Sequence, residues 1–189
     1  MLVFLDFEAS SLARHSYPIE VAWVFEDGAS ETHLIRPAPV WDDWDAAAEA
    51  IHHIRRESLL RDGMPHDALA RRMVDSLSGH DLVASAPSWD GKWLSALLRA
   101  AGLPRHALRL RDTEEAQRET ARNILLDRVA GEHLEKEVER LRITAIEALP
   151  KAVTAHRALA DAQAERARWL AVRHAAEQFH NLGWDYTDA

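Results

Sequence analysis

Cysteine is absent from this chain, and so are long uninterrupted apolar runs and any excess of positive charge. Without cysteine the chain has no disulfide framework and no thiolate metal site, which fits an intracellular protein. The opening residues MLVFLDFE carry no basic segment, and acidic residues interrupt their apolar run at once. We therefore expect neither a signal peptide nor a membrane span, and we expect a cytoplasmic location.

The formal net charge of −8 argues against a broad surface for duplex nucleic acid, because such binding depends on many Lys and Arg contacts to phosphate. A protein that holds only a strand end can be acidic elsewhere. The chain has 189 residues, 47% of them hydrophobic and 29% charged. These values predict one folded domain with a proper core.

The pattern along the chain predicts an α/β domain with a mixed five-stranded sheet flanked by helices. The expected strands cover residues 2–7, 19–25, 31–36, 81–85 and 108–111, and the short connections make the first three antiparallel neighbours. Helices are expected over 66–77, from about 89 to 102 with Ser88 as the cap, and from about 156 to 180. Between them, residues 114–149 are almost all helix formers, with a break at Gly131 and a cap at Asp112.

Two carboxylates follow the first apolar run. Asp6 and Glu8 are two residues apart, so on a strand both side chains point to the same face. Two such anions about 5 Å apart repel each other by roughly 3 kcal/mol at an effective dielectric near 20. Divalent cations bound through oxygen ligands would turn this repulsion into a favourable site.

Three further residues complete an ordered set: Asp90 at the start of a middle helix, then His156 and Asp161 near the last helix. Taken singly, Asp90 reads as a favourable acid at a helix N-terminus, and the other two as solvated helix residues. Five helical residues turn through about 500°, so His156 and Asp161 share a site only if His156 precedes the helix. Four carboxylates and one imidazole in this order indicate a metal-dependent hydrolase of phosphate esters.

At this point the chain resembles the DEDDh family of 3′–5′ exonucleases, which has a ribonuclease H-like fold. The sequence Asp6-Phe7-Glu8 is similar to its first motif, Trp89-Asp90 to its second, and the His-x4-Asp of His156 and Asp161 to its third. The segment IHHI at 51–54 resembles the family's His-Gly-Ile turn. The resemblance covers essentially the whole chain as one exonuclease domain, with 114–149 as a helical insertion or extension.

The resemblance implies hydrolysis of single-stranded or short RNA or DNA from the 3′ end, which releases nucleoside 5′-monophosphates. It assigns two Mg²⁺ or Mn²⁺ ions to Asp6, Glu8, Asp90 and Asp161, and the general base to His156. It also implies that the substrate-binding residues are Phe7, Ala9, Leu12, His53 and Trp89. Core packing is the alternative for Leu12 and Trp89. A homodimer is common among such proteins.

Two other interpretations stay open from the residues alone. The same fold can serve as a catalytically inactive module that binds nucleic acid or another protein. The acids can also match by chance in a purely structural protein. Only a clustered carboxylate site should be stabilised by added divalent metal.

Overall fold

The computed structural model describes residues 1–150 and 156–182 of the chain. These residues divide into two compact units. The first, here called the sheet unit, comprises residues 1–111 and 156–163; the second, the helical unit, comprises residues 112–150 and 164–182. Helix α7 (Ala158–Asn181) contributes residues to both units.

The sheet unit is built on a mixed sheet of six strands in the order β4-β3-β2-β1-β5-β6. Strands β1 (Leu2–Ala9), β2 (Pro18–Phe25) and β3 (Ser30–Arg36) pair antiparallel, as their short connections predicted. Strand β5 (Asp81–Ala84) runs parallel to β1, and β6 (Leu110–Asp112) forms one edge. The predicted α/β class is confirmed.

The sequence predicted five strands, and the structure adds a sixth. Strand β4 (Met64–Pro65) has only two residues and lies parallel to β3 at the other edge of the sheet. A strand this short leaves no alternating pattern that a sequence could reveal. It precedes helix α3 (His66–Leu77), whose bounds are those predicted.

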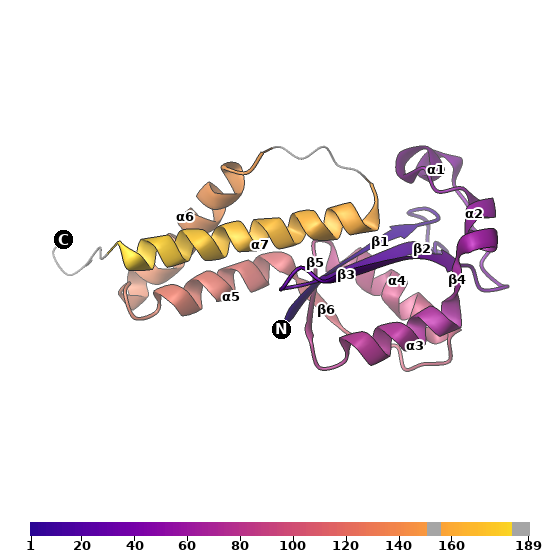
Figure 1. Ribbon diagram of the computed structural model, residues 1–189, viewed down its shortest axis with the longest axis horizontal. Coiled ribbons are helices and arrows are strands. Elements are labelled where there is room, and N and C mark those ends of the chain that lie inside the picture. The colour runs from indigo at the N-terminus through magenta and orange to yellow at the C-terminus, as the bar shows by residue number, and fades with distance from the viewer. Residues whose placement is uncertain (151–155, 183–189) are drawn as a thin grey trace. The chain divides into compact units, whose positions relative to one another are not determined.

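The two faces of β1 have different surroundings. Val3, Leu5 and Phe7 point into the main core, where the neighbouring residues of β2 and the apolar sides of α3 and α4 (Pro87–Ala100) meet them. Helices α3 and α4 lie side by side on one face of the sheet (Figure 1). Because side chains alternate along a strand, Asp6 and Glu8 point to the opposite face.

The predicted start of α4 is wrong by a short distance. The helix begins at Pro87, its N-cap residue is Ala86, and no side chain bonds to the cap, so Ser88 is not the cap. Proline at the first helical position has a fixed φ that suits a helix, and it has no N–H that would need a partner. Proline therefore starts α4 before the serine that the sequence offered.

Two short helices, α1 (Ala46–His52) and α2 (Arg56–Asp62), were not predicted. The Asp45 side chain caps α1 by accepting a hydrogen bond from the Ala47 N–H over 2.8 Å. His53 ends α1 with a left-handed φ of 56°, the conformation that glycine adopts most easily. The IHHI segment therefore does form a tight turn.

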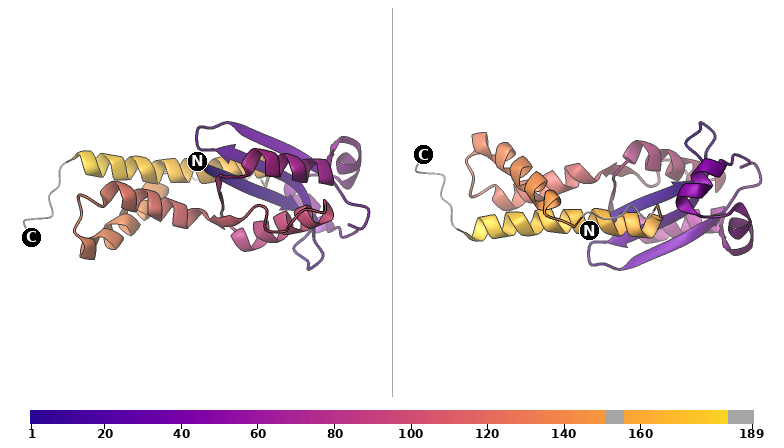
Figure 2. Two further views of the ribbon diagram at one scale, coloured as in Figure 1. Left: turned by 90° about the horizontal axis from the view of Figure 1, so that it is seen from below. Right: turned by 90° about the horizontal axis from the view of Figure 1, so that it is seen from above.

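The helical unit contains α5 (Thr113–Leu125), α6 (Gly131–Glu147) and the later part of α7, whose arrangement Figure 2 shows. Asp112 caps α5 and α6 starts at Gly131, so the predicted cap and break are confirmed. The three helices share an apolar core made of Ala121, Leu125, Val129, Leu134, Val138, Leu141, Val172 and Ala176. Within the described parts of the chain, no helix is long and apolar enough to cross a membrane.

Candidate active site

Three of the predicted carboxylates lie together in the sheet unit. Asp6, Glu8 and Asp161 each place one oxygen within 4.8 Å of the oxygens of the other two. Asp6 and Glu8 come from the same face of β1, and Asp161 comes from the first turns of α7. No other group of three potential metal-binding side chains occurs in residues 1–150 and 156–182.

Asp90 reaches the same strand from the opposite side. Its side chain is 3% exposed, and one carboxylate oxygen accepts a hydrogen bond from the Phe7 N–H over 3.3 Å. The ladder between β1 and β5 covers only Leu2, Val3 and Phe4, so the Phe7 N–H lies beyond its end. The first turn of α4 is thus anchored to β1 between Asp6 and Glu8.

His156 precedes α7, as the spacing of the last motif required. It lies two residues before Ala158, is exposed, and has a left-handed φ of 47°. Asp161 is inside the helix, where its N–H donates to the Arg157 carbonyl over 3.1 Å. A non-glycine residue with positive φ is uncommon and costs energy, and such residues cluster at functional sites.

The carboxylate cluster changes the acidity of Glu8. Burial, followed by the negative charges of Asp161 and Glu20, raises the pKa of Glu8 from 4.5 to about 7, while Arg157 opposes the change. Without a cation, Glu8 therefore keeps a proton near neutral pH. Three convergent carboxylate groups, one of which stays protonated because of its burial and its negative neighbours, fit a divalent cation with hard oxygen ligands.

Sequence reasoning missed one pair of residues beside this cluster. Glu20 lies on β2 directly opposite Glu8 and is 2% exposed. Its carboxylate accepts hydrogen bonds from the Arg157 guanidinium and from the Ala158 N–H. The signal in the sequence was a single acid inside the apolar strand PIEVAWVF, since a buried carboxylate requires a partner.

The candidate substrate residues lie in different environments. The side chains of Phe7 and Ala9 are buried, so only their backbone groups could meet a ligand. Leu12 is 71% exposed and Trp89 is 39% exposed, so neither is a core residue. The Lys92 amino group lies 4.9 Å from the centre of the Trp89 ring and donates to the carbonyl of Ala13, next to Leu12.

His53, the remaining candidate, is exposed and lines a small hollow of about 380 Å³. Arg55 and Glu49 line the same hollow. The burial of the adjacent His52, whose side chain is 3% exposed, lowers the pKa of that imidazole. The two histidines thus point into different surroundings, and His53 is the one that a ligand could reach.

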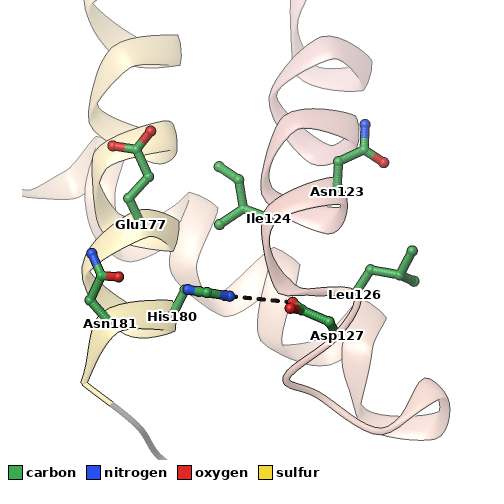
Figure 3. Close-up of a pocket in the computed structure, with 7 residues that line it drawn as sticks. All are labelled: Asn123, Ile124, Leu126, Asp127, Glu177, His180 and Asn181. Atoms are coloured by element: carbon green, nitrogen blue, oxygen red, sulfur yellow. Dashed lines mark ion pairs between the residues drawn. The ribbon is translucent and has the colours of Figure 1, made fainter.

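The helical unit has a hollow of its own, shown in Figure 3. Its volume is about 490 Å³, and it is lined by Asn123, Ile124, Leu126, Asp127, Glu177, His180 and Asn181. His180 and Asp127 form an ion pair over 3.3 Å, and Glu177 accepts a hydrogen bond from Arg173. The charged side chains Asp127 and Glu177 therefore have partners within the helical unit. None of the predicted site residues lines this hollow.

Comparisons with known proteins give one consistent result. No family model matches this chain, and no curated protein matches it either. Among solved structures, the zinc-bound E. coli exonuclease I complex with single-stranded DNA has a TM-score of 0.66 and 16% identity over 96% of this chain and 42% of that one. Exonuclease I from Methylocaldum szegediense also has a TM-score of 0.66, at 20% identity over 96% of this chain and 42% of that one.

A third neighbour, E. coli exonuclease I in complex with a dT13 oligonucleotide, has a TM-score of 0.64 and 16% identity. This chain spans about two fifths of the length of these neighbours, because 42% of each is covered. At these identities the likeness concerns the fold. The chain therefore has the α/β fold of the exonuclease I structures. Its strand β1 carries Asp6 and Glu8, α4 carries Asp90, and α7 carries Asp161.

Proposed function

We propose that this chain is a metal-dependent 3′–5′ exonuclease. It hydrolyses terminal phosphodiesters of single-stranded or short nucleic acid and releases nucleoside 5′-monophosphates. One observation carries the proposal: Asp6, Glu8 and Asp161 come from opposite ends of the chain and still gather their oxygens within 4.8 Å. Such a cluster of repelling charges has no evident structural benefit, whereas a cation site gives it one.

Asp6, Glu8 and Asp161 would hold a Mg²⁺ or Mn²⁺ ion, and Asp90 would contact a second ion directly or through water. Divalent cations at such a site make an attacking water more acidic and balance the negative charge that develops on the leaving oxygen. Raising the pKa of Glu8 to about 7 keeps the free protein from accumulating charge. A cation held by the Glu8 carboxylate would favour its unprotonated form and so displace that proton into water.

His156 is the proposed general base. Imidazole gains and loses protons near neutral pH, so it can accept the proton of the attacking water. The exposed position of His156 before α7 leaves its side chain open to an incoming strand end. Its left-handed backbone turns the chain just before the helix that carries Asp161.

The terminal nucleotide is proposed to lie between the loop after β1 and the start of α4. Leu12 and Trp89 offer apolar surface there, and stacking on an aromatic ring contributes about 1–3 kcal/mol per base. The Lys92 bond to the Ala13 carbonyl holds that loop against α4. The neighbouring exonuclease I structures contain single-stranded oligonucleotides, which supports a single-stranded substrate. They also cover both units of this chain, which supports one exonuclease domain with 114–149 as its extension.

The alternative is an inactive module that uses the same fold for binding. It is the weaker candidate because the chain contains all five residues that the proposed hydrolysis needs, namely Asp6, Glu8, Asp90, His156 and Asp161. An inactive module has no need for a cluster that raises the pKa of Glu8.

Product analysis tests the proposal. The protein is mixed with 5′-labelled single-stranded RNA and DNA oligomers, once with Mn²⁺ and once with EDTA. The expected result is a metal-dependent ladder that shortens from the 3′ end, and the preferred sugar appears in the same experiment. Absence of cleavage in both nucleic acids, with pure folded protein and Mn²⁺ present, would refute the exonuclease.

Two variants and a control assign the chemistry. Asp161→Asn should nearly abolish hydrolysis while the fold is retained. The control is Asp127→Asn, which removes an exposed acid of the helical unit that does not belong to the carboxylate cluster, and it should leave hydrolysis unchanged. His156→Asn should lower kcat more than it changes KM, because it removes the proposed base. Asparagine is chosen over alanine because it tolerates the positive φ at this position better and so preserves the backbone.

A further inference from the structure

The start of α7 is fastened to the sheet by one buried carboxylate. Glu20 accepts two hydrogen bonds from the Arg157 Nε, over 3.0 and 3.2 Å, and it also pairs with the Arg157 Nη2. The same carboxylate accepts the Ala158 N–H over 3.0 Å. Ala158 is the first residue of α7, so this bond satisfies one of the free N–H groups of the helix and places an anion at its positive end.

The contact between Glu20 and Arg157, here called the Glu20–Arg157 clamp, is connected to the carboxylate cluster at both of its ends. Glu20 is the residue of β2 that faces Glu8 in the antiparallel ladder. At the other end of the clamp, the Arg157 carbonyl accepts the Asp161 N–H over 3.1 Å, one helical turn on. Glu20 is therefore joined to β1 by the sheet and to Asp161 by the first turn of α7.

We propose that Glu20 and Arg157 are positioning residues for the hydrolysis proposed above, on which this inference rests. The Glu20–Arg157 clamp sets the distance of Asp161 from Asp6 and Glu8, and it fixes the chain on which His156 projects. Neither residue contacts the substrate in this scheme. The contacts that orient metal ligands typically affect metal affinity or activity by about 10–100-fold.

A charge effect would give a different result, which makes the proposal testable. If Arg157 acted only as a nearby positive charge, its removal would make the cluster more negative and strengthen cation binding. If it acts by positioning Asp161, its removal weakens cation binding. Lysine at this position keeps the charge but cannot form the two-pronged contact of a guanidinium with a carboxylate.

Mn²⁺ affinity is the primary measurement, made by calorimetry with the metal alone. Arg157→Gln and Arg157→Lys are both expected to weaken Mn²⁺ binding by about 10-fold or more. Adding Glu20→Gln to Arg157→Gln should weaken Mn²⁺ binding little further, because the contact between the two residues is already lost and a glutamine oxygen can still accept the Ala158 N–H. Oligonucleotide kcat should fall in all three variants, with KM changed by less than about two-fold.

Arg168→Gln is the matched control. Arg168 lies on the same helix and pairs with Glu165, a carboxylate that is only 8% exposed, but both residues belong to the helical unit. Its replacement should lower stability to a similar degree while Mn²⁺ affinity stays within about two-fold of the wild type. Circular dichroism tests whether each variant is folded. If Arg157→Gln does not fold, the Mn²⁺ affinity of Arg157→Lys decides the question.

The outcomes separate the two proposals. Unchanged or tighter Mn²⁺ binding in Arg157→Lys and Arg157→Gln would overturn the positioning role. If the wild type binds Mn²⁺ but cleaves neither RNA nor DNA, the exonuclease proposal fails while the variant affinities still decide on the clamp. If the wild type binds no Mn²⁺, both proposals are wrong.

Discussion

Replacing Glu8 with glutamine should stabilise the metal-free protein at pH 8 and reduce its response to metal. The raised pKa of Glu8, about 7 against 4.5, means that the folded protein retains a proton that the unfolded chain has lost between these values. The free energy of unfolding therefore falls as pH rises from about 4.5 to about 7, and that stability is absent above pH 7.

The size of the effect follows from the pKa. At about 1.36 kcal/mol per pKa unit, a rise from 4.5 to about 7 corresponds to about 3 kcal/mol. Glu8 is partly exposed, and solvent screening reduces this to about 1–2 kcal/mol. Glutamine has nearly the same shape and no charge, so Glu8→Gln should recover about 1–2 kcal/mol at pH 8.

Urea denaturation in EDTA, at intervals between pH 5 and pH 8, measures this. The wild type should lose stability across the range, and Glu8→Gln should lose about 1–2 kcal/mol less. With saturating Mn²⁺ the order should reverse, because the glutamine variant lacks one ligand oxygen charge. A variant that is less stable than the wild type in EDTA at pH 8, with the same gain from Mn²⁺, would refute the reasoning.

Glu139→Gln provides the control for the slope of the free energy of unfolding against pH. Hydrogen bonds from Arg142, with a further contribution from Arg118, lower the pKa of Glu139 to about 2. Its stabilising effect is complete above the unfolded pKa of 4.5 and is lost only as pH falls through about 2. The variant should therefore be less stable by the same amount at every point from pH 5 to pH 8, with no change in slope.

Four further variants test the backbone geometry and the substrate contact. A Cβ at Gly63 would lie 2.4 Å from the Leu59 carbonyl oxygen, so Gly63→Ala should lower the free energy of unfolding in urea by about 2–3 kcal/mol. No atom lies within 4 Å of a Cβ at Gly91, so Gly91→Ala in α4 should raise it by about 0.5–1 kcal/mol. His53→Gly should stabilise the fold by about 1 kcal/mol, because it relieves a left-handed φ of 56°, and no gain would mean that the His53 side chain offsets the strain. Trp89→Ala should raise KM for a single-stranded oligonucleotide by about 10-fold or more with melting nearly unchanged, and an unaltered KM would exclude base stacking.

The sequence predicted those parts of the molecule that depend on local pattern. Alternation and short connections located β1, β2 and β3, and the spacing of His156 and Asp161 required the start of α7 to lie between them. Helix α3 and the break at Gly131 were found for the same reason, since periodicity and breaker residues are local signals.

The parts that were missed depend on contacts between distant segments. Glu20 and Arg157 are 137 residues apart, and no spacing rule connects a lone acid in a strand with an arginine before a helix. Helices α1 and α2 have seven residues each, too few to show a clear period. The α4 cap was wrong because Pro87 competes with Ser88 for the first position.

The separation of Glu20 from Arg157 has a consequence for biosynthesis. A ribosome adds about 5–20 residues per second, so the 137 residues between the two partners take roughly 7–27 s to synthesise. During that time the emerging β1 and β2 cannot bury the Glu20 carboxylate at low cost, because its arginine does not yet exist. The nascent sheet must therefore keep this face hydrated, or covered by a chaperone, until α7 emerges and completes the cluster.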